Sequence, residues 1–312
     1  MILHITDTHF GAERPEVVRG LIELARAQRP SLVVLSGDVT QRARRAQFDA
    51  ARAFVDELCA ACGIDAQRDV LIIPGNHDIP LFNLPLRVLD PYGPYFRALG
   101  KRLEPLIRRP DVWLIGVNTT RPWRHKHGEL SSAQIERVAA RLRAAPDDAL
   151  RVVVTHQPLM VIERDDRRDL VRGYKAAVET WVAAGADIFL SGHTHQSFVA
   201  PLLGSARQAW VVQTGTAVSR RIRERVPNSV HLMDYKRNSD SDGIVVERWD
   251  CSAGGFDCVA HTPLLRQMVC GLWLSPVSDR PASFAAAKKQ ASSRTGASVR
   301  ARACGWSRLR PP

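Results

Sequence analysis

The chain has 312 residues, of which 45% are hydrophobic and 24% charged, values typical of a globular protein with a sizeable core. No apolar run reaches the roughly 18 residues of a membrane-spanning helix, and the N-terminus lacks the regions of a secretory leader. We therefore expect a cytoplasmic protein without a membrane span. The net charge of +12 at pH 7 suggests nucleic acid as a partner. However, residues 272–312 hold eight Lys or Arg and one acid, and therefore +7 of that excess.

The first part of the chain alternates strand-like and helix-like segments. Buried strands are predicted over 1–6, 31–36 and 69–74, a helix opens at Pro15, and another covers 45–61. Such alternation is typical of layered α/β folds, in which polar site residues gather at the carboxyl ends of the strands. Polar residues that can bind metals follow each of these three strands, namely Asp7 and His9, then Asp38, then Asn76 and His77.

The remainder continues this pattern with more loops. A Pro-punctuated region over 78–111, with a short helix near 95–103, is expected to form a rim over the site. The elements predicted after it are strands over 112–117, 151–155 and 187–190, a basic loop over 121–129, helices over 131–144 and 169–184, and three consecutive, antiparallel strands over 210–213, 229–235 and 244–249. His156 follows one strand, and His193 and His195 follow the next.

The composition changes near Cys270 to Ala, Ser, Arg and Pro without periodicity. We predict a catalytic domain over 1–270 and a basic, low-complexity, disordered tail over 271–312.

Five of the ten histidines stand at strand ends. Imidazole, carboxylate and amide groups suit Mn²⁺, Fe²⁺/Fe³⁺ or Zn²⁺, and there are too many of them for one ion. Two divalent metal ions that share one carboxylate fit this inventory better. No cysteine takes part, which argues against a structural zinc site.

These blocks resemble the calcineurin-like metallophosphoesterase superfamily, whose ordered motifs are D-x-H, G-D, G-N-H-[DE], a lone His and G-H-x-H. All five motifs are present between Asp7 and His195. The stretches 213–217 (QTGTA) and 227–229 (PNS) also resemble the subgroup with class III cyclic-nucleotide phosphodiesterases, although His156 is followed here by Gln157 where some relatives have a second His.

The resemblance implies an α/β fold of four layers, α/β/β/α, with mixed sheets flanked by helices and a metal site at the strand C-terminal ends. It implies one metal held by Asp7, His9, Asp38 and His195, and a second held by Asp38, Asn76, His156 and His193. His77 would be catalytic and would assist the leaving group while a hydroxide held between the metals attacks phosphorus. Asp78 either orients His77 or caps the following turn.

The predicted activity is hydrolysis of a phosphoester, with cyclic or small nucleotides as the favoured substrates. Arg121 and Arg220 are the predicted substrate contacts. The alternatives are a nuclease, another phosphatase or pyrophosphatase of the same superfamily, for example one acting on a lipid-linked diphosphate, and a non-catalytic metal-binding scaffold. The oligomeric state and the native metals are left open.

Overall fold

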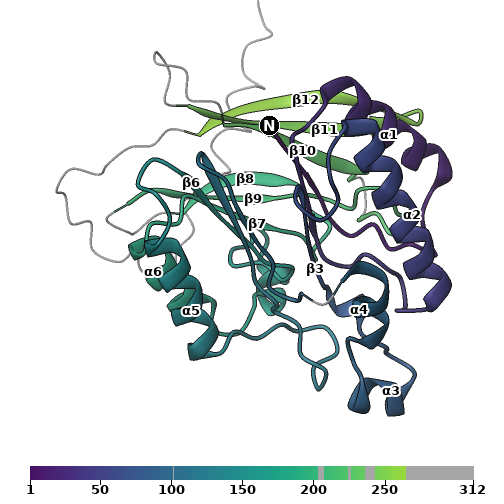
Figure 1. Ribbon diagram of the computed structural model, residues 1–312, viewed down its shortest axis with the longest axis horizontal. Coiled ribbons are helices and arrows are strands. Elements are labelled where there is room, and N and C mark those ends of the chain that lie inside the picture. Colours follow the sequence, from purple (N-terminus) through teal and green to yellow (C-terminus); the bar gives the residue numbers. More distant parts are fainter. Residues whose placement is uncertain (101, 203–206, 224–225, 236–242, 265–312) are drawn as a thin grey trace, which may run out of the picture. The chain divides into compact units, whose positions relative to one another are not determined.

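The computed structural model describes residues 1–100, 102–202, 207–223, 226–235 and 243–264, so the predicted tail over 271–312 lies outside the described residues. Two six-stranded sheets pack against each other, and helices cover the outer face of each (Figure 1). This arrangement confirms the predicted four-layer α/β/β/α fold.

The first sheet has the strand order β12-β11-β10-β1-β2-β3. Strands β1, β2 and β3 are parallel, and β10, β11 and β12 continue the sheet in antiparallel pairing. The strands are β1 (Ile2–Ile5), β2 (Leu32–Ser36), β3 (Val70–Ile73), β10 (Ser229–Asp234), β11 (Ile244–Ser252) and β12 (Gly255–Leu264). The outer face of this sheet packs on α1 (Pro15–Gln28) and α2 (Arg45–Cys62).

The second sheet has the order β4-β5-β6-β7-β9-β8, with β5, β6, β7 and β9 parallel and both edge strands antiparallel. The strands are β4 (Leu106–Arg108), β5 (Val112–Gly116), β6 (Leu150–Val154), β7 (Ile188–Ser191), β8 (Phe198–Leu202) and β9 (Ala209–Gln213). Its outer face packs on α5 (Ser132–Arg143) and α6 (Tyr174–Ala183), where Trp181 is fully buried.

The two-residue period of the strands explains the layering, because successive side chains point to opposite faces. On β1, Leu3 and Ile5 belong to the core shared with α1 and α2, whereas Ile2 belongs to the core between the sheets. The apolar runs of these strands are therefore buried on both faces, which fixes the sheets rigidly and fixes the direction of the loops at their ends.

Three predictions about elements were wrong. Residues 210–213 belong to β9 of the second sheet and not to an antiparallel run with β10 and β11, because β9 pairs parallel with β7. The helix predicted from Asp169 begins at Tyr174, because Gly173 has a φ of 84° and interrupts the helical backbone; residues Arg164–Asp169 form a separate 3₁₀ turn, η2.

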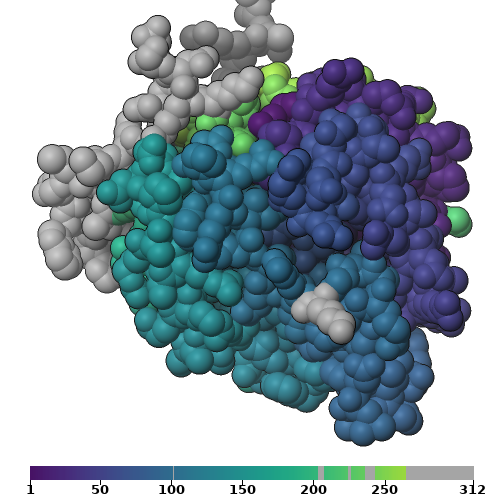
Figure 2. All heavy atoms as spheres, viewed as in Figure 1, coloured from purple at the N-terminus to yellow at the C-terminus, as the bar shows by residue number. Residues whose placement is uncertain are grey.

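The third difference lies in the expected rim. It contains the 3₁₀ turn η1 (Asn76–Asp78), α3 (Leu84–Leu89) and α4 (Gly93–Leu99) where one short helix near 95–103 was predicted. The α3–α4 segment projects at the lower edge of the view in Figure 2. Arg87 of α3 donates to the carbonyl oxygens of Pro122 (2.6 Å) and Arg124 (2.9 Å), which joins this segment to the basic loop.

Candidate metal centre

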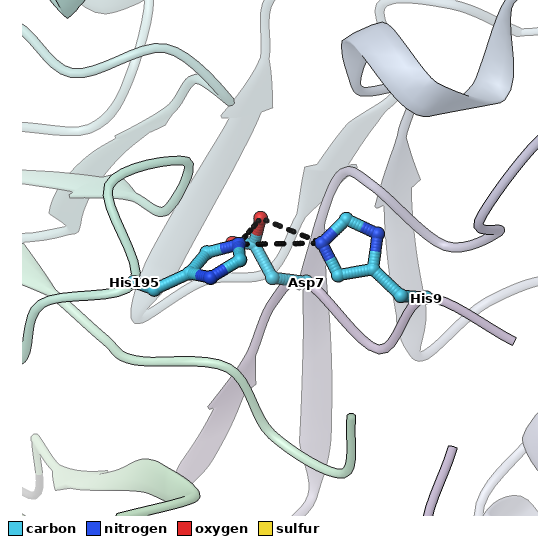
Figure 3. A group of neighbouring side chains, drawn as sticks. All are labelled: Asp7, His9 and His195. Carbon is cyan, nitrogen blue, oxygen red and sulfur yellow. Dashed lines mark hydrogen bonds and ion pairs between the residues drawn. The ribbon is translucent and has the colours of Figure 1, made fainter. Parts of the chain in front are cut away.

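Three polar side chains from distant parts of the chain meet at one point. Asp7 and His9 follow β1, and His195 follows β7. The Nε2 atom of His195 lies 3.2 Å from Asp7 Oδ1, and that of His9 lies 3.6 Å from the same oxygen. The two rings approach the Asp7 carboxylate from opposite sides (Figure 3). Imidazole nitrogens and a carboxylate oxygen at this spacing suit a divalent ion.

A second group forms around Asp38, which follows β2. His156 Nε2 lies 3.3 Å from Asp38 Oδ1, and His193 Nδ1 lies 3.3 Å from His156 Nε2. The other carboxylate oxygen, Asp38 Oδ2, lies 3.9 Å from His9 Nε2 of the first group. Asp38 therefore faces both groups with a different oxygen toward each, as a carboxylate that bridges two ions would.

The buried atoms without a hydrogen-bond partner among the described residues include an oxygen of two predicted ligands, Asp7 Oδ1 and Asn76 Oδ1. A buried oxygen without a partner is costly, so it needs an explanation. Cations bound at this cluster would satisfy both atoms. Asn76 directly follows Gly75, where a Cβ would lie 2.1 Å from Asp38 Oδ1, so only glycine lets the loop after β3 pass this close to Asp38.

The backbone of the cluster is unusual. In the described part of the chain, eight non-glycine residues have positive φ, and five of them are predicted ligands: Asp7, His9, Asp38, His193 and His195. A left-handed conformation costs an ordinary residue roughly 1–2 kcal/mol. Such conformations concentrate where the surrounding structure holds side chains in place for function.

Hydrogen bonds within the protein already fix the orientation of the predicted ligand side chains. Asp7 Oδ2 accepts from Thr6 Oγ1 (2.8 Å) and from the His193 backbone N–H (2.9 Å), so that Oδ1 is turned toward His9 and His195. The His156 Nδ1–H donates to the Ser36 carbonyl oxygen at 2.9 Å, which leaves Nε2 as the free ligand atom.

The electrostatics also fit bound cations. Burial opposes charge on Asp38, yet the neighbouring His156 and His77 hold the pKa of its carboxyl well below the usual range. Burial acts to lower the pKa of His156, but Asp38 outweighs it and raises that pKa to about 9. The buried carboxylates thus attract positive charge, and divalent ions would supply it.

His77 lies at the edge of the cluster and is half-buried. Its Nε2 atom is 4.0 Å from Asp38 Oδ2, while its Nδ1–H donates to the Gln41 carbonyl oxygen at 2.8 Å. Asp78 plays a different part from the one that would orient His77. Its carboxylate accepts from the backbone N–H groups of Val39 (3.0 Å), Thr40 (2.8 Å) and Gly75 (2.9 Å), so it braces two strand-end loops.

The two predicted substrate contacts are engaged elsewhere. Arg121 donates to the carbonyl oxygens of Asn118 (3.2 Å) and Thr120 (2.8 Å) and to the side chain of Gln134. These bonds tie the basic loop to the start of α5. Arg220 donates to the Glu13 carbonyl oxygen at 3.3 Å.

Two further residues lie near the cluster. Arg221 Nη1 lies 3.0 Å from His77 Nε2. Asp169 Oδ1 lies 3.8 Å from His193 Nε2 and 2.7 Å from Lys126 Nζ. For Arg221, the only signal in the sequence is the Arg-Arg pair at 220–221. Asp169 was not recognised because it was expected to be the first residue of a helix over 169–184.

Comparisons with known proteins agree with this geometry. The profile of the calcineurin-like phosphoesterase family matches residues 1–197, and hence more than half of the chain. The chain belongs to this family. It is thus a metal-dependent hydrolase that acts on phosphoric esters, as predicted.

Curated relatives of this phosphoesterase are distant. A protein from Rhodococcus erythropolis named "Probable cyclic nucleotide phosphodiesterase" is 25% identical over 218 residues, 65% of this chain and 67% of its own length. A Synechococcus protein, also named a probable cyclic nucleotide phosphodiesterase, is 26% identical over 210 residues, 64% of this chain and 74% of its own length.

Solved structures support the fold. A dimetal phosphatase from Danio rerio superposes with a TM-score of 0.58 at 14% identity, over 85% of this chain and 98% of that one. A purple acid phosphatase from yellow lupin reaches 0.63 at 12% identity, over 84% and 53%. No helix in the described part of this phosphoesterase is long and apolar enough to cross a membrane.

Proposed function

We propose that this phosphoesterase is a dinuclear-metal phosphodiesterase that hydrolyses cyclic or small nucleotides. The observation that carries the dinuclear proposal is Asp38, whose Oδ1 faces His156 at 3.3 Å while its Oδ2 faces His9 at 3.9 Å. The substrate class rests on the names of the Rhodococcus and Synechococcus relatives. A cytoplasmic location stays a prediction.

The residues divide into two ligand sets that share Asp38. One set would comprise Asp7, His9, Asp38 and His195, and the other Asp38, Asn76, His156 and His193. Mn²⁺, Fe²⁺/Fe³⁺ and Zn²⁺ all suit these nitrogen and oxygen donors. Bound ions would supply Lewis acidity, which neutralises charge on the phosphoester and lowers the pKa of water.

His77 is the candidate proton donor. Its Nδ1–H donates to the Gln41 carbonyl oxygen, and this bond holds the ring with Nε2 toward Asp38 and the ligand cluster. A proton carried on Nε2 would reach the oxygen of the leaving alcohol as the P–O bond breaks. A positioned general acid contributes about 10²–10⁴-fold to such reactions.

Asp78 acts on this site indirectly. Its carboxylate binds the loop after β2 and the loop after β3 through three backbone N–H groups. These bonds hold Asp38 and His77 at a fixed separation. We therefore assign Asp78 to positioning and not to proton transfer.

Hydrolysis assays test the proposal. Protein freed of metal with a chelator is assayed with and without restored Mn²⁺ on bis(p-nitrophenyl) phosphate and p-nitrophenyl phosphate, and then on a panel of cyclic nucleotides. We expect Mn²⁺-dependent cleavage of the diester and opening of a cyclic nucleotide. Cleavage of the monoester alone would make the protein a phosphatase, and stoichiometric metal without any turnover would favour a scaffold.

Two variants separate metal binding from proton transfer. Asp38→Ala should lose both metal and activity. His77→Ala should keep its metal but lose about 10²–10⁴-fold in kcat on a poorly activated diester. His261→Ala, which removes an exposed histidine of β12, is the matched control. Full activity of His77→Ala would disprove the role given to His77.

A further inference from the structure

We propose that Arg221 is a substrate-binding residue whose guanidinium donates hydrogen bonds to a non-bridging oxygen of the scissile phosphate. This inference deepens the proposed phosphodiesterase function and rests on it. Sequence reasoning selected Arg220, but the loop turns that side chain toward Glu13. The next residue points the other way, into the edge of the ligand cluster, where its Nη1 meets His77 Nε2 at 3.0 Å.

The position of Arg221 suits a phosphate ligand. His77 Nε2, which Arg221 contacts, lies 4.0 Å from Asp38 Oδ2. Asp38 is the carboxylate that faces both ligand groups, so a phosphate centred on the cluster would present an oxygen toward Arg221. Guanidinium groups bind phosphate oxygens through short, charge-assisted hydrogen bonds.

The Arg221 guanidinium also keeps N–H donors with which it can bind a phosphate. Only Nη1 is engaged within the described part of the chain, with His77 and, at 3.4 Å, with Gln41 Oε1. Arginine carries five N–H donors in a planar fork. The side chain is exposed, so the remaining donors on Nη2 and Nε are open to an incoming phosphate.

The loop that carries Arg221 is firmly anchored on both sides of it. The Arg221 backbone N–H donates to Ser219 Oγ at 3.1 Å, and Asn228 Nδ2 donates to the Ser219 carbonyl oxygen at 2.8 Å. Two residues further along, Arg223 donates to Asp166 of η2 at 2.7 Å and to Glu163, which directly precedes η2, at 2.5 Å. These bonds hold the backbone of Arg221 still, which lowers the entropy lost when its side chain binds phosphate.

The contact with His77 has a consequence for catalysis. A guanidinium only donates, so His77 Nε2 accepts, and Nδ1 carries the ring proton that goes to Gln41. A phosphate dianion or diester anion is a stronger acceptor than a neutral imidazole. Substrate would therefore draw Arg221 away from His77 Nε2, which would then take up a proton from solvent and pass it to the leaving oxygen as the P–O bond breaks. Arg221 thus links phosphate binding to the release of His77.

Phosphate titration tests Arg221 without relying on turnover. Inorganic phosphate is titrated calorimetrically into Mn²⁺-loaded wild type, Arg221→Ala, Arg221→Lys and the matched control Arg220→Ala, after metal analysis of each. We expect equal metal content, about 10- to 100-fold weaker phosphate binding by Arg221→Ala, a smaller loss for Arg221→Lys, and a change within about 2-fold for Arg220→Ala. Diester hydrolysis by the same proteins should show the loss mainly in KM.

The outcomes separate the two proposals. Phosphate binding by Arg221→Ala at the wild-type affinity would overturn the role of Arg221, whether or not the enzyme hydrolyses diesters. If metal-loaded wild type cleaves no ester but still binds phosphate more tightly than Arg221→Ala, the proposed function fails and the phosphate contact stands. Equal losses in Arg220→Ala and Arg221→Ala would also overturn the assignment, because they indicate a general effect of loop charge.

Discussion

A buried histidine pair beneath the metal centre should make the fold sensitive to acid. His4 of β1 pairs directly with His231 of β10, and their rings stack at 6.5 Å. Both side chains are fully buried, and the Nδ1 atom of each lacks a hydrogen-bond partner among the described residues. His4 Nε2 meets Ser36 Oγ at 2.8 Å. Neither ring therefore has a carboxylate partner that would stabilise its charged form.

The size of the effect follows from the pKa of His4. Burial lowers this pKa from 6.5 to about 3, despite the opposing charge of Asp7. Because the folded pKa lies below the unfolded one, the unfolded state binds the proton first, and stability falls as pH drops below about 6.5 until it levels off near 3. One pKa unit is worth about 1.4 kcal/mol, so at pH 5 the loss from His4 alone is about 2 kcal/mol.

Urea unfolding between pH 8 and pH 5 measures this loss. Wild type and His4→Gln are compared in chelator throughout, so that release of metal does not contribute. The free energy of unfolding of wild type should fall by about 2 kcal/mol more than that of His4→Gln, and the exposed His261→Gln should follow wild type. Parallel curves for wild type and His4→Gln would refute the reasoning.

Three further predictions concern the metal centre. Gly192→Ala should weaken Mn²⁺ binding at least 10-fold, because the new Cβ would lie 2.4 Å from Asp7 Oδ2. The control Gly243→Ala, whose Cβ would meet nothing within 4 Å, should bind Mn²⁺ as wild type does. Calorimetric titration with Mn²⁺ measures both affinities. Asp169→Asn should lower Mn²⁺ affinity roughly 10–100-fold, since Asp169 supports the His193 ring; unchanged affinity would exclude that support. Mn²⁺ at about 100 times its Kd should stabilise wild type by about 2.7 kcal/mol in thermal or urea unfolding, and a similar gain in Asp38→Ala would place the ions elsewhere.

The layers and the predicted ligands could be inferred from the sequence because both follow from local patterns. Apolar runs of four to six residues predicted the parallel strands, and polar residues directly after them had to reach one edge of each sheet. His4 and His231 lie within strands and not after them, so the same pattern distinguishes them from the predicted ligands.

The errors arose where tertiary contacts decide the outcome. Residues 210–213 have the same strand pattern whether they pair with β7 or with β10, and only packing of the second sheet selects β7. The start of α6 depended on Gly173, which no helical period reveals. The substrate contact predicted for Arg220 stays a prediction, but Arg220 and Arg221 are chemically identical, and only the turn held by Ser219 and Asn228 decides that Arg221 reaches His77.

This contrast suggests how chemistry and specificity are divided in this phosphoesterase. Five of the seven predicted ligands have left-handed conformations just after strand ends, held by bonds such as those from Asp7 N–H to the Gly37 carbonyl oxygen and from His9 N–H to the Asp38 carbonyl oxygen, both 3.0 Å. Strain of this kind persists only where the surroundings over-determine it, so this part of the site tolerates little change. The loops over 121–129 and 219–223 are held by side-chain bonds as well as by backbone bonds. Substitutions there change which groups face the substrate without disturbing the strand ends, so differences in substrate between family members should reside in these loops.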